Sequence, residues 1–378
     1  MECVKTGVIG LGNMGSHHAR SLAEGKVAGA VLTAVCDPRP ERLQWARNEF
    51  GTGIELFQSV DEFLERADMD GVLIATPHFS HPDIAIKAFD QGLHVLCEKP
   101  AGVETKSVRL MNEAAMKSGK VFSMMFNQRM NPVYQKVRDL ILSGELGEIK
   151  RTNWIVTDWY RPQSYYNSGG WRATWAGEGG GVMLNQAPHQ LDLWVWATGM
   201  MPVSVHAFCS FGRHREIEVE DEVTAYVKYA NGASGLFVTS IAEAPGTNRL
   251  EVTGDRGKIV VENNELHFWR LRQPESEFNE SCTAMFGQPE CWKVDIPILG
   301  ESPEHTGIMA NWADAILTGA ELVAPGQEGI HSLMVTNAVY LSAWLDERVE
   351  LPINEELYSQ LLEKKMNTST FKGVDNHV

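Results

Sequence analysis

Short apolar runs alternate with amphipathic stretches over the first third of the chain. The apolar runs have the length of buried β-strands and lie at residues 6–9, 31–36, 71–75, 95–97 and 121–126. The stretches between them have helical periodicity, as at residues 59–66, 82–91 and 106–118. Strands that alternate with helices pair in parallel, so their carboxyl ends point to one edge of the sheet. The pattern predicts an α/β domain over residues 1–128.

A different pattern follows in the second half of the chain. Over residues 203–269, apolar and polar positions alternate as they do in half-buried strands, and Asn231-Gly232 has the composition of a tight hairpin turn. Helical patterns at residues 305–317 and 329–345 close this region. We therefore expect a large, open and mainly antiparallel sheet with accompanying helices.

The two patterns divide the chain into two domains and a tail. A helix expected at residues 132–142 leads into an α+β domain over residues 129–363, which we assign to substrate binding and oligomerisation. Residues 364–378 are polar and expected to be loose. An open antiparallel sheet has one face free, and such a face commonly packs against a second subunit.

Composition excludes several classes of function. The chain has 378 residues and a formal net charge of -16 without a cluster of Lys and Arg, which argues against nucleic acid as a partner. No apolar run approaches the length of a membrane span, and the first strand begins without a basic leader, so we expect a cytoplasmic protein. The six cysteines have no C-x-x-C spacing, so neither a metal site nor a disulfide framework is predicted.

The first apolar run leads into a glycine-rich turn with G-x-G-x-x-G spacing, Gly10-Leu11-Gly12-Asn13-Met14-Gly15. Gly10 permits the tight turn, Gly12 lets the backbone approach a pyrophosphate, and Gly15 allows the next helix to pack on the strand. Asn13 and Met14 begin that helix, whose amino end faces the phosphates. We predict that all of these positions except Leu11 bind a dinucleotide.

Asp37 ends the second strand, 22 residues beyond Gly15. An acidic side chain at this place hydrogen-bonds both ribose hydroxyls of the cofactor. Its charge repels a 2′-phosphate, which favours NAD as the cofactor. Arg39 could stack on the adenine or bind a phosphate, so use of NADP stays open.

Polar residues also follow the later strands of the first domain. Glu98-Lys99-Pro100 follows the run at residues 95–97, and a lysine at such a strand end is seldom needed for folding. Pro100 restricts the backbone of Lys99 and should hold it rigidly, so Lys99 is the main candidate for chemistry. The cofactor contacts expected at these strand ends are Thr76, Pro77, His81, Glu98, Lys99 and Gln128.

A segment rich in aromatic residues opens the second domain. Six of the eleven tryptophans lie in residues 154–196, interleaved with arginines and tyrosines. Aromatic faces stack on sugar rings while polar side chains hydrogen-bond the hydroxyls, so this segment suits a polyhydroxylated substrate. We expect substrate contacts from Arg161, Tyr166, Trp171 and Arg172.

The glycine triplet Gly179-Gly180-Gly181 precedes a predicted helix that carries three polar residues. Asn185, His189 and Asp192 have the spacing i, i+4, i+7, which places them on one helical face. Pro188 suits a first helical turn, so the helix could begin or kink there and displace Asn185. We expect the glycines to leave room for a ligand, His189 and Asn185 to be catalytic, and all three polar residues to contact substrate.

Taken together, these motifs resemble the glucose-fructose oxidoreductase, inositol dehydrogenase and rhizopine-catabolism family of NAD(P)-dependent oxidoreductases over nearly the whole chain. The residues that carry the resemblance are Gly10 to Gly15, Asp37, Thr76-Pro77 with His81, Glu98-Lys99-Pro100, and the glycine triplet with His189. The resemblance implies a Rossmann domain, an open-sheet domain, and homodimers or homotetramers that assemble through that sheet. It also implies a cis Lys99-Pro100 bond and hydride transfer at a secondary alcohol of a sugar or cyclitol.

The chain departs from the family pattern at two positions. The family often has Asp four residues before the histidine, where this chain has Asn185, and usually Asn after the Thr-Pro pair, where this chain has His78. An amide can hydrogen-bond a hydroxyl but cannot accept its proton. The role of the carboxylate is therefore absent or passes to Asp192.

These residues suggest how an alcohol would be oxidised to a ketone. His189 would take the hydroxyl proton, Lys99 would stabilise the charge on the oxygen, and Asn185 would position a neighbouring hydroxyl, although Lys99 and His189 could exchange roles. The substrate is expected to be a sugar or a glycoside, with oxidation at C3, as in some relatives, among the reactions considered, and inositol is the next choice. An NAD-dependent glycosidase and a non-catalytic dinucleotide sensor are the alternatives, and Lys99 and His189 argue against the sensor.

Overall fold

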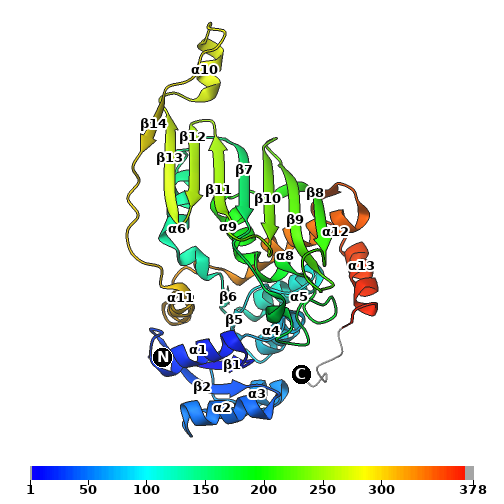
Figure 1. Ribbon diagram of the computed structural model, residues 1–378. Coiled ribbons are helices and arrows are strands. Elements are labelled where there is room, and N and C mark those ends of the chain that lie inside the picture. The colour runs from blue at the N-terminus through cyan, green and yellow to red at the C-terminus, as the bar shows by residue number, and fades with distance from the viewer. Residues whose placement is uncertain (1, 371–378) are drawn as a thin grey trace.

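The computed structural model describes residues 2–370 and contains two sheets, one above the other in Figure 1. The first sheet is parallel throughout, with the strand order β3-β2-β1-β4-β5-β6. Its strands are β1 Val4–Ile9, β2 Ala30–Cys36, β3 Glu55–Phe57, β4 Gly71–Ile74, β5 His94–Cys97 and β6 Phe122–Met124. Its helices are α1 Asn13–Ala23, α2 Pro40–Phe50, α3 Val60–Arg66, α4 His81–Asp90 and α5 Thr105–Ser118. The predicted Rossmann architecture is confirmed, whereas α2 and β3 were not anticipated.

The second sheet has nine strands in the order β14-β13-β12-β11-β7-β10-β9-β8-β15. They are β7 Ile149–Val156, β8 Pro202–Phe211, β9 Glu220–Tyr229, β10 Ser234–Ser240, β11 Asn248–Gly254, β12 Gly257–Glu262, β13 Glu265–Leu271, β14 Cys291–Val294 and β15 Val349–Glu350. Among the described strands of this sheet, only β7 and β10 pair in parallel. The expected large, mainly antiparallel sheet is therefore confirmed, including the hairpin between β9 and β10.

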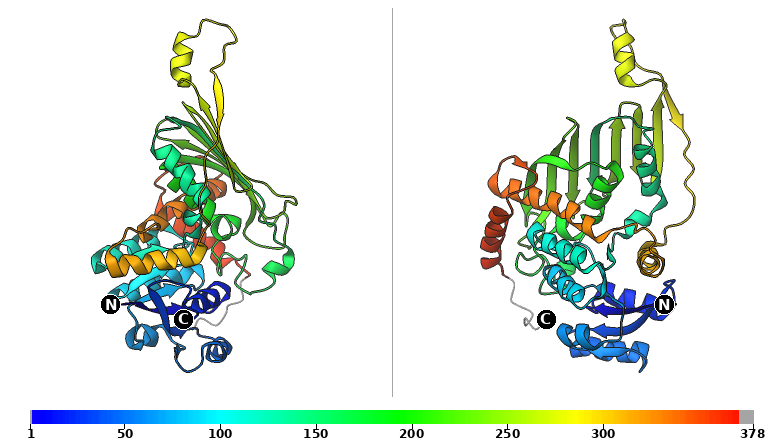
Figure 2. Two further views of the ribbon diagram at one scale, coloured as in Figure 1. Left: turned by 90° about the vertical axis from the view of Figure 1, so that its left-hand side faces the viewer. Right: turned by 180° about the vertical axis from the view of Figure 1, so that it is seen from behind.

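One face of this second sheet is covered by helices and the other is open (Figure 2). The covering helices include α6 Pro132–Leu142, α9 Pro188–Thr198 and α12 Gly329–Leu345. Buried and exposed side chains alternate along β9, which explains this arrangement. Val223, Ala225 and Val227 are buried, while Tyr226 on the opposite face is 45% exposed. The sheet thus has an apolar face toward the helices and a second face toward solvent.

Helix α11, Glu304–Thr318, returns to the first sheet although it lies late in the chain. Trp312 of this helix is buried against β4, where a methyl group added at Gly71 would lie 2.8 Å from the indole ring. Ser123 of the first domain also forms a bridge with Pro325. Late segments therefore help to build the core of the first domain, which the sequence pattern did not indicate.

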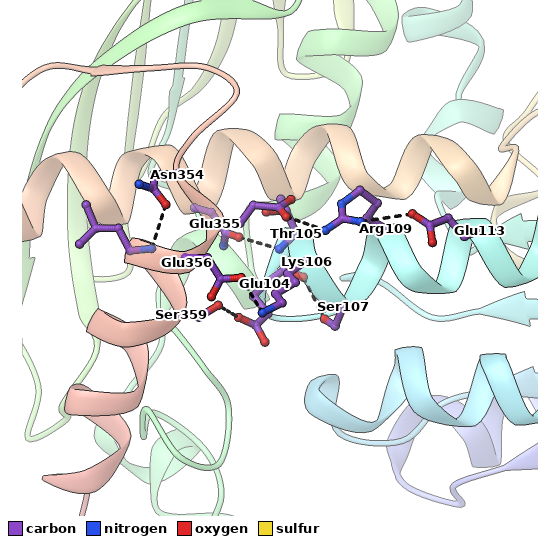
Figure 3. A network of polar contacts seen from close by, with 12 residues as sticks. Glu104, Thr105, Lys106, Ser107, Arg109, Glu113, Asn354, Glu355, Glu356 and Ser359 are labelled. Carbon is purple, nitrogen blue, oxygen red and sulfur yellow. Dashed lines mark hydrogen bonds and ion pairs between the residues drawn. The ribbon is translucent and has the colours of Figure 1, made fainter.

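The C-terminal helix α13, Glu355–Asn367, is anchored to the start of α5, as Figure 3 shows. Lys106 Nζ lies 2.8 Å from a Glu356 carboxylate oxygen, and Arg109 lies 2.9 Å from Glu355. These pairs are exposed and each contributes little free energy, so they orient the helix more than they stabilise it.

The tail expected to be loose at residues 364–378 is in part ordered. Residues 364–367 form the last turn of α13, and Lys365 Nζ lies 5.3 Å from the centre of the Phe211 ring. Thr370 hydrogen-bonds Glu218. This correction has a physical reason, since the lysine stem covers aromatic surface that the sequence pattern could not locate. Residues 371–378 lie outside the described part of the chain.

An arm extends beyond the second sheet after β13 and carries helix α10, Glu275–Ser281 (Figure 1). Over residues 2–370, we find no helix whose length and apolar character would allow it to cross a membrane.

Candidate active site

The glycine-rich turn lies at the carboxyl edge of the first sheet, between β1 and α1. Gly10 has a φ of 89°, and an added methyl group would lie 2.6 Å from the Ala75 carbonyl oxygen. A methyl group at Gly15 would lie 1.7 Å from the Gly10 carbonyl oxygen, whereas at Gly12 it would meet no atom within 4 Å. Gly10 and Gly15 therefore serve the turn and its packing, while Gly12 leaves space where a pyrophosphate could approach. Asn13 and Met14 are exposed beside that space.

Asp37 lies at the end of β2 with its carboxylate held in place. One oxygen accepts a hydrogen bond from Leu11 N at 2.7 Å, and the other accepts from Arg39 N at 3.0 Å. Arg39 Nε lies 3.0 Å from the same carboxylate, and the arginine side chain is 48% exposed. The carboxylate is thus fixed beside the glycine-rich turn, where the ribose of a dinucleotide would lie.

Lys99 projects from the loop after β5, and its peptide bond to Pro100 is cis. Its neighbour Glu98 is buried, accepts from Lys99 N at 3.1 Å and pairs with His18 Nε2 at 2.7 Å. Burial alone would raise the pKa of Glu98, but the hydrogen bond and charge of His18 outweigh it and hold that pKa at about 2. Glu98 therefore fixes the backbone of Lys99 from within the protein, which differs from the expected direct contact with cofactor.

His81 connects two of the strand-end loops. Its Nδ1 lies 2.8 Å from the Pro100 carbonyl oxygen, and its Nε2 lies 2.8 Å from the Thr76 carbonyl oxygen. The side chain is buried between these two carbonyl groups, so His81 positions the loops. A contact between His81 and the cofactor stays a prediction. Thr76, Pro77 and Gln128 are at least partly exposed at the same edge.

The glycine triplet packs against the protein itself, which corrects the expectation that it leaves room for a ligand. A methyl group added at Gly179 would lie 2.4 Å from Val103, one at Gly180 would lie 2.2 Å from the Tyr340 hydroxyl, and one at Gly181 would lie 2.1 Å from the Glu220 carbonyl oxygen. The buried Glu220 carboxylate accepts from Gly181 N at 2.9 Å and so anchors the segment. Its pKa is raised to about 7 by burial.

Two short helices follow the triplet in place of one. Helix α8 spans Val182–Asn185, and α9 begins at Pro188 in its first turn. The break at Pro188 that the sequence allowed is therefore present, so Asn185 and His189 lie on separate helices. Lys99 Nζ donates a hydrogen bond to the Asn185 carbonyl oxygen at 3.0 Å, which joins the two domains.

His189 lies in the first turn of α9 and is partly exposed. Among the described residues, its Nδ1 has no hydrogen-bond partner. Burial, and then the positive charge of Lys99, lower the pKa of His189 to about 3. The imidazole is therefore neutral near pH 7 and can accept a proton.

Asp192 faces away from this group. Its carboxylate forms a two-pronged ion pair with Arg129, with distances of 2.6 Å and 2.8 Å, and both side chains are almost fully buried. Asp192 therefore does not supply the carboxylate that is missing at position 185. The reason is that the turn of α9 beyond His189 points into the interface with residues 127–130.

Glu178 is the carboxylate that the sequence reading missed. It is buried, accepts a hydrogen bond from the Asn185 side-chain amide, and accepts another from Ala173 N at 2.6 Å. Burial raises the pKa of Glu178 to about 6. Its position directly before the glycine triplet was the available signal. A negative charge therefore lies behind Asn185 even though residue 185 itself is an amide.

Among the residues expected to bind substrate, Arg161 and Arg172 lie close enough to Lys99 for their charges to act on its pKa. The Trp171 ring lies 5.8 Å from the His78 ring, and Arg172 lies 4.7 Å from the centre of Trp171. Arg161 is partly exposed, whereas Tyr166 is buried beneath Tyr165 with ring centres 5.1 Å apart. Of the remaining tryptophans of the segment, Trp154, Trp175 and Trp194 are core residues, and Trp159 and Trp196 are partly exposed.

A parallel sheet with an open glycine-rich turn, a fixed acid after β2 and a Lys–His pair at the domain junction defines a dinucleotide-dependent oxidoreductase. The comparison with protein families agrees. Residues 4–126 match the oxidoreductase family with an NAD-binding Rossmann fold, and residues 134–260 match the GFO/IDH/MocA C-terminal domain. The chain belongs to this GFO/IDH/MocA family, and its cofactor is NAD.

Several characterised proteins are similar to this chain. The rhizopine catabolism protein MocA of Rhizobium meliloti is 31% identical over 54% of this chain and 60% of its own length. The scyllo-inositol 2-dehydrogenase (NAD(+)) of Bacillus subtilis (strain 168) is 27% identical over 68% of this chain and 73% of its own. The WlbA dehydrogenase from Bordetella pertussis, solved with NADH and UDP-GlcNAcA, is 27% identical with a TM-score of 0.79, covering 93% of this chain and all of that one.

Proposed function

We propose that this protein transfers a hydride between NAD and a secondary alcohol carbon of a sugar, a glycoside or a cyclitol. The observation that carries the proposal is the position of Lys99, which follows β5 beside the cofactor edge and reaches Asn185 in the second domain. A related protein is named as an inositol dehydrogenase, and another was solved with a nucleotide sugar. Oxidation of a pyranose or glycoside at C3 is the substrate reaction we favour, with inositol next.

NAD, when bound, supplies the hydride acceptor. Gly10, Gly12, Asn13, Met14 and Gly15 would hold its pyrophosphate. The Asp37 carboxylate would hold its ribose, and its charge disfavours NADP.

Two side chains of this protein would accept the proton from the substrate hydroxyl and stabilise the negative charge on its oxygen. The neutral His189 imidazole accepts the hydroxyl proton, and the Lys99 ammonium donates a hydrogen bond to the same oxygen as negative charge develops there. Asn185 has its amide nitrogen engaged by Glu178, so its side-chain oxygen is the atom that would accept a bond from a neighbouring hydroxyl.

The reaction is tested by supplying NAD with a panel of sugars, glycosides and cyclitols and following the absorbance of reduced cofactor. Net formation of NADH with one class of substrate is the expected result. Release of a free sugar without net NADH would indicate the glycosidase alternative, and binding of NAD without any turnover would indicate a dinucleotide sensor.

The pH dependence of turnover distinguishes the roles of Lys99 and His189. Burial lowers the pKa of Lys99 below its ordinary value. Because the cation is the form present below that pKa, kcat/KM should fall as the pH rises through it. If Lys99 were instead the base, its neutral amine would be the active form, and kcat/KM would rise over the same range.

A Lys99→Arg variant is the control for this assignment, because arginine keeps its charge over the whole range. The alkaline fall should be absent from the residual activity of that variant. Profiles of log kcat/KM against pH for both proteins provide the measurement, and a rise with pH in the parent protein would reverse the two roles.

We further propose a cytoplasmic homodimer or homotetramer that assembles through the open face of the second sheet. Phe208 and Tyr226 are 63% and 45% exposed on β8 and β9, which is more apolar surface than strands facing only solvent usually carry. Light scattering gives the mass in solution, and cell fractionation gives the location.

A further inference from the structure

Two arginines flank one tyrosine at the edge of the candidate active site. The guanidinium carbon of Arg172 lies 4.6 Å from the centre of the Tyr165 ring, and that of Arg161 lies 5.3 Å from it. Arg172 also donates a hydrogen bond to the Tyr165 hydroxyl at 2.8 Å. The two cations are therefore held close together on a common aromatic support.

Neither arginine forms an ion pair with a carboxylate among residues 2–370. Over the described residues, the Arg161 guanidinium donates only to the Tyr160 carbonyl oxygen, at 3.0 Å, and the Arg172 guanidinium only to the Tyr165 hydroxyl. Ten other arginines of the described chain have a carboxylate within 4 Å: Arg20, Arg39, Arg66, Arg109, Arg129, Arg213, Arg249, Arg270, Arg272 and Arg348. Six more, like Arg161 and Arg172, have none within residues 2–370, so the lack of an ion pair is not by itself distinctive. What distinguishes Arg161 and Arg172 is that both guanidinium groups lie against one ring and both act on the charge of Lys99, which concentrates positive charge at this place in a protein of formal charge -16.

Lys99 adds a third positive charge to the group. The Tyr165 hydroxyl lies 3.5 Å from the Gln186 side-chain nitrogen, and the adjacent Asn185 carbonyl oxygen accepts from Lys99 Nζ. Burial lowers the pKa of Lys99, and Arg161 and Arg172 lower it further, although Glu98 and Glu178 oppose them. Within residues 2–370, Glu178 forms no hydrogen bond with either arginine, and its oxygens accept from the Asn185 side-chain amide and from Ala173 N. The charge of Arg172 nevertheless acts on Glu178 through space and lowers its pKa.

Gln186 provides an independent indication of a ligand at this place. It is 6% exposed, and over the described residues its side-chain oxygen has no hydrogen-bond partner. A buried acceptor without a partner costs free energy unless a ligand supplies the donor. The Gln186 side-chain oxygen can accept a hydrogen bond from a hydroxyl group. Trp171 offers an aromatic face nearby, and Arg172 offers a cation without a carboxylate partner in the described chain.

We propose that the natural substrate is a sugar acid, free or within a larger glycoside, whose carboxylate is bound by Arg161 and Arg172 while its reacting carbon faces Lys99 and His189. The inference rests on the proposed function, which it narrows to an anionic class of substrate. A carboxylate matches the planar guanidinium fork, and Glu178 nearby repels a single negative charge less than it repels a phosphate dianion.

The test compares matched substrates with NAD: glucose with glucuronate, galactose with galacturonate, and glucose 6-phosphate as the other anionic sugar. We expect kcat/KM to be about 10- to 100-fold higher for the acid than for its neutral partner, the range that a hydrogen-bonded charged pair supplies. The ratio of acid to neutral kcat/KM should fall about tenfold or more in Arg172→Gln and in Arg161→Gln. Arg348→Gln, which changes an exposed arginine paired with Glu350, should retain the parent ratio.

Each outcome has a separate meaning. Equal or better use of the neutral sugars, with NADH formed, would overturn the carboxylate site and leave the proposed function intact. Preference for glucose 6-phosphate over both acids would overturn the choice of carboxylate. Absence of NADH formation with every sugar and cyclitol would instead count against the proposed function. Titration with NADH verifies that each variant is folded, so an unchanged acid-to-neutral ratio in folded Arg161 and Arg172 variants would also overturn the inference.

Discussion

Replacement of Lys99 or His189 by alanine is expected to lower kcat by about 10²- to 10⁴-fold, the range found when a general base or an oxyanion-stabilising donor is removed. Lys99 Nζ lies 3.0 Å from the Asn185 carbonyl oxygen, and burial lowers the pKa of His189 to about 3, so its imidazole is neutral near pH 7 and can accept a proton. Affinity for NADH should change little, because the glycine-rich turn and Asp37 lie outside the replaced groups.

Steady-state kinetics and NADH titration provide the measurements for these two variants. Lys87→Ala and His267→Ala serve as controls, because Lys87 pairs with Asp61 on the surface of α4 and His267 lies on the distant strand β13. The controls should keep the parent kcat. Near-normal turnover in both Lys99→Ala and His189→Ala would remove these side chains from the mechanism.

Replacement of Asp192 by alanine is expected to lower the free energy of unfolding by about 3–5 kcal/mol, the cost of leaving one member of a buried ion pair without its partner. The Arg129 side chain is 2% exposed and donates hydrogen bonds to both carboxylate oxygens of Asp192. Its other contacts, to Glu328 and to the Val323 carbonyl oxygen, cannot compensate fully.

Urea unfolding of the full chain gives the change in stability, with Asp139→Ala as the control. Asp139 is 63% exposed and pairs with Lys136 at 3.0 Å, so its loss should cost at most about 1 kcal/mol. A parent-like unfolding midpoint for Asp192→Ala, together with a kcat reduced as in His189→Ala, would place Asp192 in the chemistry and contradict the structural role.

The cofactor edge could be predicted from sequence because its rules are local. A strand, a tight turn and a helix that packs closely need glycine at fixed positions, and Gly10 and Gly15 are the positions where the structure has no room for a side chain. Lys99 was found for the same reason, since the end of a parallel strand fixes the edge at which the residue lies.

The partners of Asn185, His81 and Asp192 could not be obtained in this way. Spacing along a helix predicts which side chains share a face, but it does not predict which residues that face contacts. Asp192 meets Arg129, His81 joins two carbonyl groups, and Asn185 meets Glu178, which lies earlier in a loop. The contacts of Asp192 with Arg129 and of His81 with Pro100 depend on how distant segments pack, and that of Asn185 with Glu178 depends on the path of the loop between them.

The sequence by itself determined the class of fold, the dinucleotide edge and the two side chains proposed for chemistry, because the alternation of strands with helices and the spacing of glycines act over short distances. Only the tertiary structure decided which charges are neutralised within the protein and which remain available. Asp192 and Arg129 neutralise each other in the interior, whereas Arg161 and Arg172 share Tyr165 without a carboxylate partner in the described chain. Electrostatic pairing depends on distances in space and on burial, and neither is encoded in the spacing of residues along the chain.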